Sequence, residues 1–197
     1  MYAMLILLVL IGYLVGSIPA GYWFGWYWFG IDITKQGSGN IGASNVARVL
    51  GTRFFLLIFA IDALKAYATV VATHYVTNAM VIYGFPYWYF VACALLVGNG
   101  HSLFLRGKGG RGVATATGIL MHCLPSFFTL IFMGIWALVV VLTHRPFVAS
   151  LASMLMLMII LLCGWCHAHT ALILVICVWI VSKHLPHLRA LWIETRR

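Results

Sequence analysis

At 197 residues, with 64% apolar and only 8% charged side chains, the chain is too apolar for a soluble globular domain. Twelve Lys and Arg outweigh three acidic residues and give a formal net charge of +9. In a soluble protein this balance would suggest nucleic acid, but the apolar runs assign the charge to cytoplasmic loops or to an anionic substrate. We therefore expect an integral membrane protein in a lipid bilayer, with a retained N-terminal span and no nucleic-acid partner.

The charged residues divide the chain into apolar runs. Residues 1–31 contain no Lys, Arg, Asp or Glu, and neither do residues 66–105, 112–144 and 146–182. Because about 20 residues cross a bilayer as a helix, each of the three later runs is close to the length of a helical hairpin. A turn signal lies near the middle of each: Asn78 with Gly84-Phe85-Pro86, then His122-Cys123-Leu124-Pro125, then Gly164-Trp165-Cys166-His167.

These runs predict an all-α integral membrane protein with seven transmembrane helices, forming a single transmembrane domain over residues 1–197. Loops with Lys or Arg fall on one side, and the mid-run turns, which contain neither, fall on the other. This parity places the N-terminus outside and the C-terminus in the cytoplasm. Residues 113–121, rich in Gly, Ala and Thr, are predicted to form a short or tightly packed helix. The aromatic residues at 22–29 are interpreted as an interfacial belt at the end of the first span.

The polar stretch from Gly37 to Arg48 stands out in this apolar chain. Its glycines let the backbone turn and bring N–H groups close to a ligand. Neutral hydrogen-bonding groups and flanking cations complete the chemistry of an anion site, and phosphate is the anion we expect. The polar residues are Ser38, Asn40, Ser44 and Asn45, with Lys35 and Arg48 as cations. The spacing Gly-x-Gly-x-x-Gly matches the dinucleotide fingerprint, but that motif needs a preceding strand, whereas membrane helices are expected here.

A second loop, Arg106-Gly107-Lys108-Gly109-Gly110-Arg111-Gly112, also combines glycine with positive charge on the same predicted side. It lacks the order and spacing of a Walker A loop. Since it opens into the apolar run at Val113, its N–H groups are expected at a helix N-terminus, where anions bind well. One such loop would be an ordinary basic loop, but two on the same side favour a shared phosphate site.

Other polar residues have more than one interpretation. Asp62 and Lys65 lie one turn apart within the second span, where buried charges either pair or line a polar cavity. A structural pair and a contribution to a substrate site both remain open. Cys163-x-x-Cys166, with two histidines after it, has the spacing of a metal site, but membrane thiols usually only pack. We assign no metal and expect no cofactor.

The eight histidines are candidate catalytic bases. No His is followed by an Asp at the spacing of the His-x4-Asp acyltransferases, so an acid-assisted histidine base is not expected. His101 and His184 fall on the basic side, close to the two loops, and are the better candidates for proton or hydrogen-bond roles.

Three groups of residues carry a family resemblance. Gly16-Ser17-Ile18-Pro19-x-Gly21 and the stretch from Gly37 to Gly51 closely resemble the first motif of the PlsY family. Gly100-His101 with the stretch from Lys108 to Thr115 resembles the second. These are bacterial membrane glycerol-3-phosphate acyltransferases that use acyl-phosphate, not acyl-CoA, and make lysophosphatidic acid.

The resemblance implies a seven-span, N-out protein of the bacterial cytoplasmic (inner) membrane, acting in phospholipid biosynthesis with its active site facing the cytoplasm. The implied partners are glycerol-3-phosphate, acyl-phosphate and, as a further candidate, the enzyme that makes acyl-phosphate. Ser38 and Arg48 would hold glycerol-3-phosphate and Lys108 would help to hold phosphate, with His184 as the fourth catalytic residue. The implied substrate-binding residues are Gly39, Asn40, Asn45, Gly109, Gly110, Arg111, Ser150, Ser153 and His187.

The chain departs from the family's pattern at several positions. Ser44 stands where Thr is usual, and the segment between His101 and Lys108 is shorter and lacks the family's Pro. The third motif, normally His-Arg-x-Asn-Ile, appears as His184-Leu185-Pro186-His187-Leu188. Two alternatives therefore stay open: a catalytically weakened paralogue that binds phosphorylated ligands or a partner enzyme, and an anion transporter suggested by Asp62 and Lys65.

Overall fold

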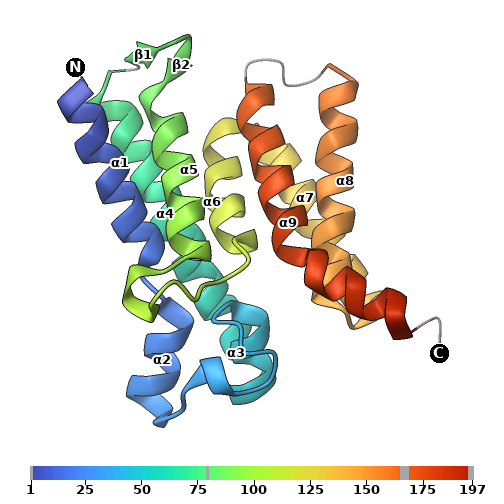
Figure 1. The fold of residues 1–197 in the computed structure, drawn as a ribbon. Helices are drawn as coiled ribbons and strands as arrows, with labels where there is room; N and C mark the ends of the chain where they lie inside the picture. The colour runs from blue at the N-terminus through green and yellow to red at the C-terminus, as the bar shows by residue number, and fades with distance from the viewer. Residues whose placement is uncertain (1, 79, 165–168, 195–197) are drawn as a thin grey trace. The chain divides into compact units, whose positions relative to one another are not determined.

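The computed structural model describes residues 2–78, 80–164 and 169–194, without the side chains of residues 162 and 187–194. It is mostly helical and divides into two compact units, residues 1–122 and 123–197. Through α6 the elements are α1 (Tyr2–Ser17), α2 (Ala20–Phe29), η1 (Ile33–Lys35), α3 (Ala43–Leu50), α4 (Phe54–Val76), β1 (Val81–Ile82), β2 (Phe85–Pro86), α5 (Tyr87–Gly100), η2 (Leu103–Leu105) and α6 (Val113–Cys123) (Figure 1). The second unit contains α7 (Ser126–Thr143), α8 (Pro146–Leu162) and α9 (Thr170–Glu194).

Close helix contacts build the first unit around α5, most of whose residues are buried. α1 packs along α5, and α4 contacts both helices. At Gly98 the backbones of α5 and α1 approach so closely that an added Cβ would overlap the carbonyl oxygen of Tyr13. Lipid supplies no hydrophobic drive between helices, so small residues that allow such approach supply much of the packing energy. α6 packs on α4 in the same way, through Gly118 against the backbone of Ala63, as expected for a tightly packed helix.

A break separates α1 from α2. α1 ends at Ser17, α2 begins at Ala20, and the two helix axes differ by 41°. Pro19 causes the break, because its nitrogen carries no hydrogen and its ring disfavours the helical conformation at Ile18. The sequence predicted one uninterrupted apolar run over residues 1–31, whereas its aromatic end forms a helix of its own.

The membrane spans agree with the prediction in part. In the part of the chain that the structure describes, three segments can cross a membrane by length and composition, Phe54–Val76, Tyr87–Leu105 and Ser126–Thr143, and the bent pair α1–α2 would make a fourth. Within the described residues, shorter apolar helices at Val113–Cys123, Pro146–Leu161 and Thr170–Pro186 occupy the other ranges where spans are expected. Seven full spans and the orientation of the termini stay predictions.

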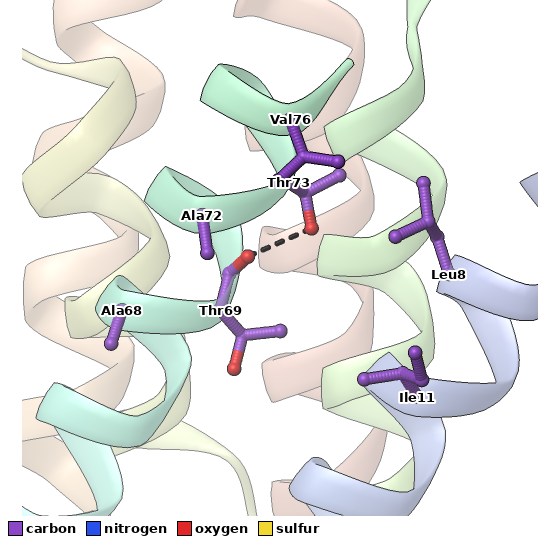
Figure 2. A pocket seen from close by; sticks show the side chains of 7 residues that line it. All are labelled: Leu8, Ile11, Ala68, Thr69, Ala72, Thr73 and Val76. Carbon is purple, nitrogen blue, oxygen red and sulfur yellow. Dashed lines mark hydrogen bonds between the residues drawn. The ribbon is translucent and has the colours of Figure 1, made fainter.

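A cavity of about 320 Å³ lies between α1 and α4, and Figure 2 shows the side chains around it. Two threonines of α4 contribute to its wall, but their hydroxyls are bonded to the helix itself. Thr69 donates to the carbonyl of Lys65 at 2.7 Å, and Thr73 donates to the carbonyl of Thr69 at 2.8 Å. The cavity offers aliphatic side chains and no charge, so it is not an anion site. Its lining residues are Leu8, Ile11, Ala68, Thr69, Ala72, Thr73 and Val76.

Replacing a helical glycine by alanine should destabilise the protein where two helix backbones meet, as at Gly98, and not where the glycine faces open space, as at Gly134. Gly98→Ala should destabilise the protein by about 1–3 kcal/mol, because the new methyl group overlaps the α1 backbone. Gly134 of α7 is the matched control, since an added Cβ there meets nothing within 4 Å. Gly134→Ala should be neutral or stabilising by up to about 1 kcal/mol, because Ala is the better helix former. Thermal unfolding in detergent measures both, and equal effects would contradict the packing.

Candidate functional site

The first glycine-rich loop lies between η1 and α3 and has an ordered start. The Thr34 backbone N–H and hydroxyl both donate to Asp32 Oδ1, at 2.9 and 2.6 Å. These hydrogen bonds, with a smaller contribution from Lys35 at 3.5 Å, hold the pKa of Asp32 below its ordinary value. At the other end of the loop, Asn40 Oδ1 accepts the N–H of Gly42, which precedes the first residue of α3.

An apolar cluster anchors this loop to the helices beneath it. Ile33 of η1, Ala43 and Val46 of α3, and Ile58 of α4 are buried together. The phenylalanines that pack against them come from α2 and α4: Phe24, Phe54, Phe55 and Phe59. Burial of one face of α3 leaves its other face and the glycine turn for polar residues.

The side-chain amide of Asn45 holds the loop together from inside. It is 2% exposed, and its nitrogen donates to the carbonyls of Asn40 at 2.8 Å, Gln36 at 3.0 Å and Ile33 at 3.3 Å. An amide nitrogen has two hydrogens, so these three acceptors use its whole donor capacity. In this structure Asn45 therefore organises the loop. A direct contact between Asn45 and a substrate stays a prediction.

The acceptor atom of the same amide brings Ser38 and Arg48 together. Asn45 Oδ1 accepts the backbone N–H of Ser38 at 2.8 Å and Nη1 of Arg48 at 3.3 Å. Gly37 makes this possible, because its φ of +55° favours glycine and an added Cβ would overlap Asn45 Oδ1. Ser38 and Arg48 themselves are exposed, so a hydroxyl and a guanidinium face outward from one point of the loop.

The second glycine-rich loop folds back on the end of α5. The Ser102 N–H donates to the carbonyl of Lys108 at 3.2 Å, and the Gly107 N–H donates to the carbonyl of Ser102 at 2.9 Å. The Gly110 N–H donates to the carbonyl of Asn99 at 2.7 Å, and Gly109 lies so close that an added Cβ would overlap the same carbonyl. The fold leaves Lys108 exposed at the turn.

The two loops lie at the same end of the first unit. In Figure 1 the α2–α3 segment and the α5–α6 connection are both at the lower end of this unit. α2 bridges them, because Trp23 lies 5.5 Å from Phe104 of η2, measured between ring centroids. The pKa of Arg111 is lowered first by burial and then by the positive charge of Arg48, which lies near enough to repel it. Cations held this close favour an anion bound beside them.

The predicted residues of the second unit lie inside its helix packing. Ser150 of α8 accepts the indole N–H of Trp136 from α7 at 3.2 Å, and the Ser153 hydroxyl donates to the carbonyl of Ala149 at 2.9 Å. The imidazole Nδ1 of the buried His184 lies 2.7 Å from the carbonyl oxygen of Ile180, one turn earlier in α9. That contact holds the imidazole ring against its own helix.

His187 also belongs to α9, but its side chain lies outside the described residues. The same is true of the Cys-x-x-Cys segment from residue 165 onward. A meeting of His184, Ser150 and Ser153 with the two loops stays a prediction.

Sequence reasoning missed Asn99 and Ser102, whose backbone groups hold the second loop, while the Ser102 hydroxyl donates to the carbonyl of Ser17. Neither residue is charged, and Asn99 stands between Gly98 and Gly100 at the end of α5. Their position directly at the end of α5, before a loop already suspected of binding phosphate, was the available signal.

Two basic, glycine-rich loops lie at one end of an apolar helical unit, as expected for an integral membrane protein with a candidate anion site. The family model described as "Glycerol-3-phosphate acyltransferase" matches residues 6–193. The chain therefore belongs to the glycerol-3-phosphate acyltransferase family, as the sequence motifs predicted.

Individual relatives agree with this assignment. A glycerol-3-phosphate acyltransferase of Synechococcus sp. (strain JA-2-3B'a(2-13)) is 41% identical over 152 residues, 76% of this chain and 70% of the relative. Glycerol-3-phosphate acyltransferase 2 of Moorella thermoacetica is 35% identical over 150 residues, 76% of this chain and 74% of the relative.

A crystal structure of PlsY (YgiH), an integral membrane glycerol 3-phosphate acyltransferase in its glycerol 3-phosphate form, superimposes with a TM-score of 0.84. The two chains share 26% identity, and the match covers 97% of this chain and 93% of the other. The lysophosphatidic acid form of that protein gives 0.83 with the same identity and coverage.

The amide of Asn45 provides a test of the loop. Asn45→Asp should lower kcat/KM for acyl transfer to glycerol-3-phosphate by about tenfold or more, because a carboxylate would face three carbonyl oxygens and has nothing to donate. Asn78→Asp is the matched control, since Asn78 is an exposed turn residue with φ of +45°, which Asp also tolerates. Steady-state assays of both variants decide, and normal activity in Asn45→Asp would show that the loop does not need its amide.

Proposed function

We propose that the chain transfers a fatty acyl group from acyl-phosphate to glycerol-3-phosphate and releases lysophosphatidic acid and inorganic phosphate. Membership of the family supports glycerol-3-phosphate as the acyl acceptor. The solved relative was obtained in a glycerol 3-phosphate form and in a lysophosphatidic acid form, which correspond to this acceptor and this product. Two separate basic loops suit a reaction in which both substrates carry phosphate. The observation that carries the proposal is the pairing of Ser38 and Arg48 on one amide oxygen, with Arg48 close to Arg111 of the second loop.

The reaction balances without a protein nucleophile. A hydroxyl oxygen of glycerol-3-phosphate forms a bond to the acyl carbonyl carbon, and the bond from that carbon to the bridging phosphate oxygen breaks. The leaving phosphate takes the electron pair, and the hydroxyl proton passes to a phosphate oxygen. Because acyl-phosphate is already activated, the protein mainly has to align two anions and stabilise the charge that develops.

Each loop has a role in this scheme. Ser38 and Arg48, with Asn40, bind glycerol-3-phosphate, and Gly39, whose N–H donates to the carbonyl of Gln36, turns the loop beside them. The Lys108 side chain and the backbone N–H of Gly109 bind the phosphate of the acyl donor, with Arg111 beside them, while the Gly110 N–H stays bonded to the carbonyl of Asn99. Four further predicted residues belong to the second unit, where His184 is proposed as a hydrogen-bond partner of the reacting groups and Ser150, Ser153 and His187 as binding residues. Asn45 of the first unit is proposed to act close to glycerol-3-phosphate.

The membrane arrangement follows from the charge pattern. We place the chain in the bacterial inner membrane as one transmembrane domain of seven spans, with the N-terminus outside and both basic loops at the cytoplasmic face. Water-soluble glycerol-3-phosphate then enters from the cytoplasm, while the acyl chains of donor and product stay in the bilayer. The enzyme that makes acyl-phosphate is a candidate partner at the same face.

The role of Arg48 is tested by truncation. Arg48→Ala should lower kcat/KM by about 100-fold or more, since a charge-assisted contact to phosphate is worth about 1.5–3 kcal/mol and charge also develops in the transition state. Arg53→Ala is the matched control: Arg53 is exposed, its guanidinium carbon lies 4.8 Å from the centre of the Phe54 ring, and it belongs to neither loop. Turnover that survives in Arg48→Ala at the level of Arg53→Ala would contradict the assignment.

The donor is tested on the purified wild-type chain. Acyl-phosphate and acyl-CoA are supplied in parallel with radiolabelled glycerol-3-phosphate, and the lysophosphatidic acid formed is separated and counted. We expect product with acyl-phosphate and at most a trace with acyl-CoA, since the leaving phosphate is part of the proposed chemistry. Product from acyl-CoA at an equal rate would contradict the donor assignment, and glycerol-3-phosphate binding without any product would identify a weakened paralogue.

A further inference from the structure

The break between α1 and α2 exposes three successive backbone carbonyls, and side chains from two other segments satisfy all of them. Lys65 Nζ of α4 donates to the carbonyl of Ile18 at 2.6 Å and lies 3.5 Å from the carbonyl oxygen of Gly16. The Ser102 hydroxyl donates to the carbonyl of Ser17 at 2.6 Å. A helix end leaves its last carbonyls without intrahelical partners, and in an apolar unit these donors replace water.

Asp62 holds Lys65 in this place. The ammonium lies 2.6 Å from the Asp62 carboxylate, and both side chains are buried, with 11% and 8% of their surface exposed. With one carboxylate and two carbonyls as partners, all three donors of the ammonium are used. The pair therefore serves the helix break, in agreement with the structural pair that was one of the two interpretations from the sequence.

Both glycine-rich loops are attached to this break. α2 starts directly after it, and Gly21 of α2 packs so closely on the first loop that an added Cβ would overlap the carbonyl oxygen of Ile41. The second loop is attached through Ser102, whose side chain binds the break while its N–H donates to the carbonyl of Lys108. One hydrogen-bonded junction thus connects the Ser38–Arg48 loop and the Lys108 loop to the same point of the backbone.

We propose that Ser102 and the Lys65–Asp62 pair are positioning residues, which set the separation of the two loops and hence the alignment of the two substrates. The inference rests on the proposed function, because it requires each loop to hold one of the reacting molecules. A small misplacement of the reacting groups lowers the rate of the chemical step far more than it lowers substrate affinity, since each loop still binds its own phosphate. Loss of the junction should therefore lower kcat and leave the affinity for each substrate nearly unchanged.

Ser102→Ala tests this with little disturbance, because it removes one buried hydroxyl and keeps the volume small. We expect kcat to fall by about tenfold or more, while the dissociation constant for glycerol-3-phosphate, measured by calorimetry, stays within about threefold. Thr73→Val is the matched control, since it removes a hydroxyl that donates at 2.8 Å to a carbonyl within α4, away from the break. Its kcat should equal that of the wild type, and its melting temperature should be close to that of Ser102→Ala.

A neutral pair tests the other half of the junction. Asp62→Asn with Lys65→Gln removes both charges together, so no single charge is left buried, but Gln is too short to reach the carbonyls that Lys65 binds. If the neutral pair and Ser102→Ala both act through the break, their effects should not multiply. The fold-loss of kcat in the triple variant should be much smaller than the fold-loss in the neutral pair multiplied by that in Ser102→Ala.

The outcomes separate this inference from the function on which it depends. A wild-type chain without acyl transfer would overturn the proposed function. An active wild type with unchanged kcat in Ser102→Ala, or a loss of kcat matched by an equal loss of glycerol-3-phosphate affinity, would overturn the positioning role alone. A combined variant whose fold-loss of kcat equals the product of the losses in Ser102→Ala and in the neutral pair would also contradict a shared junction.

Discussion

Backbone carbonyls in an apolar medium need donors, and this requirement shapes the end of the first unit where the two glycine-rich loops lie. The helix that starts at Tyr2 is interrupted at Pro19, and the carbonyls of Gly16, Ser17 and Ile18 lose their usual helical partners there, although the Ile18 carbonyl also accepts the N–H of Ala20 at 3.2 Å. Lys65 and Ser102 satisfy them from different parts of the chain. Through these hydrogen bonds, the break joins α4 and the second loop to α1 and α2.

The charge of the site is held in place by neutral groups. Asp62 and Lys65 pair within the helices, while the cations that face outward, Arg48 and Lys108, are positioned by an amide and by backbone hydrogen bonds. Asn45 fixes the first loop without adding a negative charge that would compete with phosphate. A binding site for two anions gains from this arrangement, because its positive potential is not neutralised before the substrates arrive.

The sequence predicted the parts of this structure that depend on local pattern. Uncharged runs predicted apolar helices, of which some can span a membrane, and the charged, glycine-rich stretches predicted both loops. The three-residue spacing of Asp62 and Lys65 allowed an ion pair as one of two interpretations, and that pair is present. It did not predict α2 as a separate helix, because the apolar run continues past Pro19 to residue 31 without a Lys, Arg, Asp or Glu to mark an end.

The role of each polar residue was harder to predict than its presence. Asn45 was expected beside the substrate, and its amide is used within the loop, because three carbonyls converge on it only after the chain has turned at Gly37. Ser102 carries no motif, since its partner Ser17 is far away in sequence. The roles assigned to Ser150, Ser153 and His184 stay predictions, as do seven spans and the acyl-phosphate donor.

The claim on which the account depends is that one backbone junction fixes the distance between the two loops. Electron–electron double resonance measures that distance directly, with nitroxide labels at Gln36 and Leu103, both exposed, in an active variant whose five native cysteines have been replaced. The account predicts one narrow distance distribution, which broadens when Ser102→Ala is added and not when Thr73→Val is added. A distribution that is already broad in the active protein, or that is unchanged by Ser102→Ala, would contradict it.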